Sequence, residues 1–282
     1  MRWEGVHTAL VTPFADGRLD LDAWEALVAR QVRAGVQGVV VAGTTGESPT
    51  IDADEAARLL AEAVQVVQRQ AIVTMGVGTN NTRTTVANVV RAQEGGAEAG
   101  LLVLPYYNKP NLTGLRAHVR AAAEPGLPLV LYHVPGRTGQ RLNPTELAVL
   151  CEIERVVAVK EATGDVSFGQ EFMLRSAQPV LSGDDFTWMP LLAVGGSGVV
   201  SVLSNVAPRR TVAVWEAWAR GDAGSARREH AALLPVVRYL FAESNPIPVK
   251  AMMAEMGLCR NELRLPLAPG TPPDEALLPD LA

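Results

Sequence analysis

Short runs of apolar, mostly β-branched residues alternate along the chain with longer segments whose apolar positions recur at helical spacing. The runs are almost continuously apolar, as expected for strands buried on both faces of a parallel sheet. They predict eight strands, at residues 6–11, 38–42, 71–77, 101–104, 129–134, 156–160, 179–181 and 199–202. The helical segments lie at residues 20–34, 53–69, 82–94, 114–123, 143–150, 166–176, 186–194 and 209–220.

Eight strand–helix units within the first 220 residues predict an α/β fold, a (β/α)8 TIM barrel. We expect residues 1–220 to form the barrel that carries the active site. Residues 221–282 contain two further helical segments, 222–242 and 246–257, and are expected to form a C-terminal helical extension packed on the barrel. The alternative is a doubly wound open sheet, which favours a GxGxxG fingerprint; the glycine-rich stretch at residues 76–81 lacks its third glycine.

Composition, charge and residue spacing argue against several classes of protein. Apolar residues make up 48% of the chain and charged residues 20%, with a formal charge of −5, so nothing favours nucleic acid or an anionic membrane as partner. No apolar run approaches the roughly 20 residues that span a bilayer. The N-terminus has no signal-like apolar segment, so we expect a cytoplasmic protein. Cys151 and Cys259 and the four histidines lack metal-ligand spacing, so we expect buried thiols and no metal.

Lysine is unusually rare in this chain. Only Lys109, Lys160 and Lys250 occur, although lysine and arginine together number 25. Lys160 ends the apolar run at residues 156–160, and the carboxyl ends of barrel strands form the active-site rim. An apolar rim disfavours the ammonium ion and yields the neutral amine that attacks a carbonyl group. The alternative is a lysine paired with a carboxylate such as that of Glu161. The scarcity favours Schiff-base chemistry.

Other strand ends carry groups that fit such chemistry. Thr44 and Thr45 lie in a Gly-Thr-Thr-Gly loop whose hydroxyls and backbone N–H groups suit a carboxylate. Tyr132 and Tyr107 can relay protons if their phenols join a chain of hydroxyls with Thr44. Arg137 can bind a second carboxylate in bidentate fashion. Taken singly, each of these residues also has an ordinary structural explanation.

Several strings, in this order, resemble the dihydrodipicolinate synthase / N-acetylneuraminate lyase family of class I aldolase-like enzymes. They run from Ala9-Leu10-Val11-Thr12-Pro13 through Gly43–Glu47, Pro105–Asn108, Lys160–Gly164 and Ser182–Asp185 to Asn245-Pro246-Ile247-Pro248-Val249-Lys250. Arg137-Thr138-Gly139 after Tyr132 resembles the dihydrodipicolinate synthase branch, in which the arginine meets the carboxylate of aspartate semialdehyde. The resemblance covers nearly the whole chain.

The resemblance implies a mechanism. Lys160 would form an imine with pyruvate, with no separate cofactor, and the enamine would attack L-aspartate 4-semialdehyde on the way to lysine and diaminopimelate. Thr44 and Thr45 would hold the pyruvate carboxylate, and Gly183 and Val200 match positions near its pocket. Tyr132, Thr44 and Tyr107 would relay protons, with Tyr107 reaching into a neighbouring subunit. Such enzymes are usually homotetramers, built as dimers of dimers.

Two departures from the family pattern bear on specificity. The common Tyr-Asn-Val-Pro string is here Tyr132-His133-Val134-Pro135. Lysine-inhibited relatives often carry a histidine and a glutamate at the positions of Ala56 and Thr84, while Asn80 and Tyr106 are retained, so we expect weak or no feedback by lysine. Two alternatives stay open: another pyruvate-dependent aldolase or dehydratase, such as a sugar-acid lyase, and a barrel without activity.

Overall fold

Eight parallel strands form a closed barrel in the order β1, β10, β9, β8, β7, β6, β5, β4. The structure is a computed structural model that describes residues 2–278. The strands are β1 (Gly5–Ala9), β4 (Gly38–Val41), β5 (Ile72–Gly76), β6 (Ala99–Val103), β7 (Leu129–His133), β8 (Val156–Glu161), β9 (Val180–Ser182) and β10 (Gly198–Ser201). Each predicted run overlaps one of them. The (β/α)8 fold is therefore confirmed, and a closed sheet excludes the doubly wound alternative.

The helices follow the predicted segments closely. They are α1 (Leu21–Ala34), α2 (Ala53–Val67), α3 (Thr82–Glu94), α4 (Leu112–Ala123), α5 (Pro135–Thr138), α6 (Pro144–Cys151), α7 (Val166–Met173), α8 (Trp188–Ala193), α9 (Pro208–Ala219), α10 (Ala223–Leu240) and α11 (Ile247–Glu255). Asp52 and Asn143 cap α2 and α6, each in a capping box with a glutamate three residues later. The pattern did not predict α5, which has only four residues.

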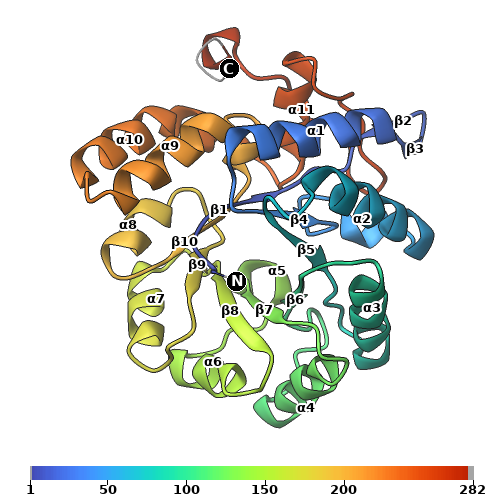
Figure 1. Ribbon diagram of the computed structural model, residues 1–282, viewed down its shortest axis with the longest axis vertical. Coiled ribbons are helices and arrows are strands. Elements are labelled where there is room, and N and C mark those ends of the chain that lie inside the picture. The colour runs from blue at the N-terminus through green and yellow to red at the C-terminus, as the bar shows by residue number, and fades with distance from the viewer. Residues whose placement is uncertain (1, 279–282) are drawn as a thin grey trace. The chain divides into compact units, whose positions relative to one another are not determined.

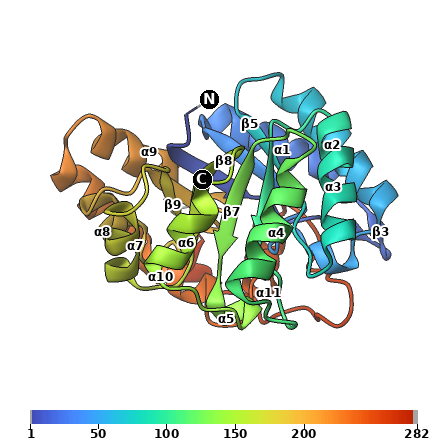
Figure 2. The same cartoon turned by 90° about the horizontal axis from the view of Figure 1, so that it is seen from below.

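The internal contacts group the chain into two compact units, each with its own set of strands and helices. The first comprises residues 2–4 and Thr74–Val200. Within it, β6, β7, β8 and β9 pair in parallel, and α3, α4, α6 and α7 lie on their outer side (Figure 1). Figure 2 shows α5 directly beyond the carboxyl end of β7. The strand interiors are apolar on both faces, as the continuous runs predicted.

The second unit comprises Gly5–Val73 and residues 201–278. It holds β1 paired in parallel with β4, and α9 packed beside α10 (Figure 1). A short hairpin of β2 (Phe14–Ala15) and β3 (Arg18–Leu19), which the pattern did not predict, follows β1. The described chain beyond residue 220 forms α10, α11 and the 3-10 turn Glu275–Leu277, with turns and loop segments between them. The boundary between barrel and extension at residue 220 stays a prediction.

Candidate active site

Lys160 and Tyr132 lie side by side because of the register of two parallel strands. Tyr132 on β7 pairs directly with Lys160 on β8, so their side chains point to the same face of the sheet. Lys160 Nζ lies 4.0 Å from the centroid of the Tyr132 ring. Both residues are buried, at 6% and 5% exposure. The strand pairing thus places a phenol against the amine that the sequence singled out.

The surroundings of Lys160 favour its neutral form. The pKa of Lys160 is lowered to about 7, first by burial and second by the positive charge of Arg137, while the negative charge of Asp185 partly opposes both. No ion pair holds Lys160 within the part of the chain that the structure describes. The alternative pairing with Glu161 is therefore not found: the Glu161 carboxylate instead accepts a hydrogen bond from the Thr163 N–H at 2.6 Å.

Gly183 provides the space that the Lys160 side chain occupies. A Cβ atom at position 183 would lie 2.9 Å from Lys160 Cε and 2.7 Å from the Ala162 side chain. Its backbone N–H donates to the Glu161 carbonyl oxygen at 2.6 Å, which fixes this close approach. Only glycine fits here without moving the lysine. Val200, on β10 of the same unit, is buried, with 3% exposure.

Arg137 and Tyr107 lie on two loops that share a backbone hydrogen bond. Arg137 is exposed in the last turn of α5, which ends at Gly139 with a left-handed φ of 68°. The N–H of Tyr107 donates to the Thr138 carbonyl oxygen at 3.2 Å. Tyr107 has a φ of 72°, and 88% of the residue is exposed. The structure thus links the predicted carboxylate-binding arginine to the turn that presents the Tyr107 phenol to solvent.

The threonine loop follows β4 in the second unit. Thr45 is buried, at 3% exposure, and its hydroxyl accepts a hydrogen bond from Asn245 Nδ2 at 2.8 Å. Thr44 is half-buried. The N–H groups of Gly46 and Ser48 donate to the Gly43 carbonyl oxygen, at 3.1 and 3.2 Å. The N–H of Gly46 therefore closes the loop, although we expected the backbone N–H groups of this loop to suit a carboxylate.

Sequence reasoning missed a buried ion pair next to this loop. Lys250 Nζ donates to Glu47 Oε1 at 2.7 Å, and the two side chains have 0% and 1% exposure. Glu47 belongs to the Gly43–Glu47 string and Lys250 to the Asn245–Lys250 string, so both motifs were noticed but not their pairing. The scarcity of lysine was the signal that could have prompted the search for a partner.

His133 stands where the family that the sequence resembles commonly has an asparagine, and it is held away from solvent. Its Nε2 accepts a hydrogen bond from the Leu142 N–H at 3.2 Å, and its ring stacks on Phe168 with centroids 5.1 Å apart. Burial, followed by the charge of Arg141, lowers the pKa of His133 to about 4. The imidazole is therefore neutral at pH 7 and serves as a hydrogen-bond acceptor for the chain after α5.

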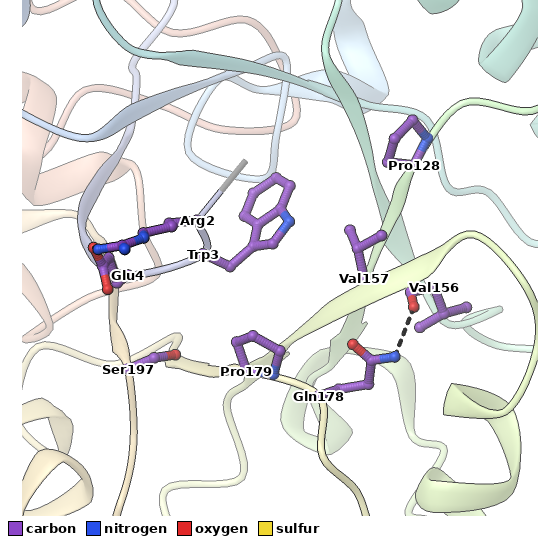
Figure 3. A pocket seen from close by; sticks show the side chains of 9 residues that line it. All are labelled: Arg2, Trp3, Glu4, Pro128, Val156, Val157, Gln178, Pro179 and Ser197. Atoms are coloured by element: carbon purple, nitrogen blue, oxygen red, sulfur yellow. Dashed lines mark hydrogen bonds and ion pairs between the residues drawn. The ribbon is translucent and has the colours of Figure 1, made fainter.

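A groove of about 610 Å³ lies at the other end of β8 (Figure 3). Its lining includes Val156, the first residue of β8, and Gln178, whose side chain donates to the Val156 carbonyl oxygen at 2.9 Å. Trp3 lines the same groove (Figure 3). Lys160 lies toward the opposite, carboxyl end of β8. Since residues at the amino ends of barrel strands serve stability, we assign no chemistry to this groove.

The remaining predicted features concern metals, membranes and thiols. Within residues 2–278, no group of three or more His, Cys, Asp or Glu side chains is arranged to hold a metal ion. None of the described helices has the length and apolar character needed to cross a membrane. Cys151 is buried and Cys259 half-buried, both as free thiols. Burial raises the pKa of Cys151 to about 12 and that of Cys259 to about 11, so neither is a reactive thiolate.

Comparison with known proteins gives one consistent result. The model of the dihydrodipicolinate synthetase family matches residues 2–276. A 4-hydroxy-tetrahydrodipicolinate synthase of Exiguobacterium is 46% identical over 278 residues, covering 97% of this chain and 95% of the relative. The crystal structure of dihydrodipicolinate synthase from Thermotoga maritima is 41% identical, with a TM-score of 0.93 over 98% of this chain and 95% of that one.

A second solved structure, described as the first monomeric dihydrodipicolinate synthase variant, is 41% identical and has a TM-score of 0.93. It covers 98% of this chain and 93% of its own. Sequence, fold and the site around Lys160 therefore agree: the chain belongs to the dihydrodipicolinate synthetase family.

Proposed function

We propose that this protein is a lyase that condenses pyruvate with L-aspartate 4-semialdehyde through a Schiff base on Lys160, giving 4-hydroxy-tetrahydrodipicolinate. The observation that carries the proposal is a buried lysine with a pKa of about 7 beside a tyrosine ring. The names of the relatives support the choice of substrates. The reaction serves the biosynthesis of lysine and diaminopimelate.

The chemistry starts with the neutral amine. Lys160 Nζ attacks the keto carbon of pyruvate, and loss of water gives a protonated imine. Removal of a proton from the methyl group forms the enamine, whose carbon attacks the aldehyde carbon of the semialdehyde. The amino group of the second substrate then attacks the imine carbon, expels Lys160 and closes the ring. One water leaves overall, and the lysine is regenerated without a separate cofactor.

Tyr132 is suited to move protons in these steps. Its position against Lys160 puts its phenol next to the atoms that lose and gain protons during imine formation. We assign Thr44 and Tyr107 to the same relay, following the family resemblance. The exposure of Tyr107, at 88%, supports its donation to a neighbouring subunit.

The remaining site residues bind substrate. Thr44 and Thr45 would hold the pyruvate carboxylate, since the loop after a barrel strand lies at the active-site rim. Gly183 and Val200 would line the pyruvate pocket. Arg137 would bind the carboxylate of the semialdehyde, and its guanidinium favours this substrate over a sugar-derived one. Weak or absent inhibition by lysine stays a prediction from Ala56 and Thr84.

Assembly is part of the proposal. A tyrosine donated between subunits requires at least a dimer, and we propose a homotetramer built as a dimer of dimers. The similar monomeric variant makes a direct measurement necessary. Sedimentation analysis gives the mass. Mixing refolded Tyr107→Phe and Lys160→Ala chains then tests donation, because a mixed dimer would contain one site with both groups intact and regain activity. We propose the cytoplasm as its location, which cell fractionation can check.

Borohydride reduction in the presence of pyruvate tests the central step. The expected result is a stable adduct on Lys160, found by peptide mass spectrometry, and none in Lys160→Ala. A coupled assay with aspartate semialdehyde and a panel of other aldehydes tests the substrate. Turnover only with sugar-derived aldehydes would transfer the assignment to another branch of the family, and absence of any adduct would favour a barrel without activity.

A further inference from the structure

The turn that begins α11 reaches the threonine loop through the side chain of Asn245. Asn245 Nδ2 donates to the hydroxyl of Thr45 at 2.8 Å, although the two residues are 200 positions apart in sequence. A threonine hydroxyl has two lone pairs and one proton. Because the amide N–H occupies one lone pair, the hydroxyl has to direct its own proton to another acceptor. The bond thus makes the Thr45 hydroxyl a hydrogen-bond donor to an acceptor that binds next to the threonine loop.

The same C-terminal segment also holds the backbone of the loop, through what we call the loop clamp: Thr12, Glu47 and Lys250. Lys250 Nζ donates to Glu47 Oε1 at 2.7 Å and to the Thr12 carbonyl oxygen at 2.8 Å. The Thr12 hydroxyl donates to the Gly46 carbonyl oxygen at 2.7 Å. Glu47 has a left-handed φ of 56°, which a non-glycine residue adopts only when its surroundings enforce it. The clamp supplies that enforcement.

We propose that Asn245 is a positioning residue for the pyruvate carboxylate: it orients the proton of the Thr45 hydroxyl toward the substrate anion, on a loop that the clamp keeps in place. This inference rests on the proposed function, because it takes Thr45 as a ligand of the carboxylate. Burial of Thr45, at 3% exposure, limits the number of competing water partners and makes the orientation effective.

Two substitutions separate orientation from packing. Asn245→Ala removes the donor, and we expect the KM for pyruvate to rise about tenfold with little change in the KM for aspartate semialdehyde, because the Thr45 hydroxyl loses the bond that directs its proton to the carboxylate. Asn245→Asp is nearly isosteric but can only accept from Thr45, so it captures the hydroxyl proton and sets a negative charge beside the substrate anion. We therefore expect Asn245→Asp to raise the KM for pyruvate more than Asn245→Ala does.

A double substitution tests whether Asn245 acts through Thr45. In a Thr45→Val background, Asn245→Ala should raise the KM for pyruvate by less than about twofold further, since the group it orients is already gone. Asn261→Ala is the matched control: its Nδ2 donates to the Gly270 carbonyl oxygen at 3.2 Å in the same C-terminal region, and it should leave both KM values unchanged. Asn245→Ser, whose side chain is too short to reach Thr45, should repeat the effect of alanine and serves if alanine prevents folding.

The outcomes are distinct. An aspartate variant milder than the alanine or serine variant, or additive effects with Thr45→Val, overturns the inference and leaves Asn245 a packing residue. If wild-type protein forms no adduct with pyruvate on Lys160, the proposed function itself fails. Thermal unfolding of every variant confirms that the KM values are measured on folded protein.

Discussion

The molecule contains two lysines that are buried in similar packing. The charged residue with the strongest influence on each has the opposite sign. Lys160 and Lys250 have 6% and 0% exposure, and the Nζ atom of each lies over an aromatic ring, at 4.0 Å from the centroid of Tyr132 and 4.3 Å from that of Phe14. Burial lowers the pKa of both. The next contribution differs: Arg137 lowers the pKa of Lys160 further, whereas Glu47 raises that of Lys250.

Burial alone therefore does not make a lysine a nucleophile. Lys250 donates to a carboxylate and a carbonyl oxygen, so its ammonium is satisfied and its role is structural. Lys160 has a phenyl ring and a nearby guanidinium charge instead, which favours the neutral amine that imine formation needs. Exposed Lys109 is the third lysine and offers a reference for a lysine with neither environment.

Removing the Lys160 amine should have the largest effect. Lys160→Met keeps the length and apolar packing of the side chain but cannot form an imine, so we expect loss of both turnover and the pyruvate adduct. Lys109→Met, the matched control, should retain both. Steady-state rates and mass spectrometry after borohydride treatment measure the outcome, and an adduct that persists in Lys160→Met would show that another amine reacts.

Removing the ion pair between Lys250 and Glu47 should lower the free energy of unfolding. Lys250→Met leaves the Glu47 carboxylate buried without its partner, and we expect a loss of about 3–5 kcal/mol in the free energy of unfolding. Urea unfolding measures the change. The double variant Lys250→Met with Glu47→Gln removes both charges and should recover part of it. A single variant as stable as wild type would mean that the pair contributes nothing net.

The pH dependence of imine formation should follow Lys160. With a pKa of about 7, the neutral fraction of Lys160 is nearly constant above pH 8 and falls about tenfold for each pH unit below 7. The initial rate of adduct formation with pyruvate and cyanoborohydride should show this fall. A rate that keeps rising to pH 10 would instead indicate an amine with an ordinary pKa.

The smallest effects should come from the two charges near Lys160, and they should be opposite in sign. Arg137→Gln removes a positive charge that lowers the pKa of Lys160, so the pH midpoint of adduct formation should move upward. Asp185→Asn removes a negative charge that raises this pKa, so the midpoint should move downward. We expect each shift to be less than about one pH unit. Pyruvate trapping avoids any effect of Arg137 on the second substrate, and shifts in one common direction would contradict the electrostatic explanation.

The sequence predicts this fold well because the strands of a parallel barrel are buried on both faces and appear as continuous apolar runs. The helices between them appear as segments with helical periodicity. It identifies Lys160 because the residue ends such a run in a chain with few lysines. It does not predict that Lys250 pairs with Glu47 or that Asn245 contacts Thr45. These partners are 203 and 200 residues apart, and no local sequence pattern links them. The hairpin β2–β3 and α5 are too short to leave a periodic pattern.

The bare backbone at position 183 constrains how this site can change. A single methyl group there would lie 2.9 Å from Lys160 Cε, closer than two carbon atoms pack. In the proposed reaction Lys160 Nζ bonds to a ketone carbon, and a methyl group at position 183 would displace the methylene that carries this nitrogen. Substitutions in loops farther from Lys160 can therefore change the aldehyde substrate. At position 183, even alanine would obstruct formation of the proposed imine.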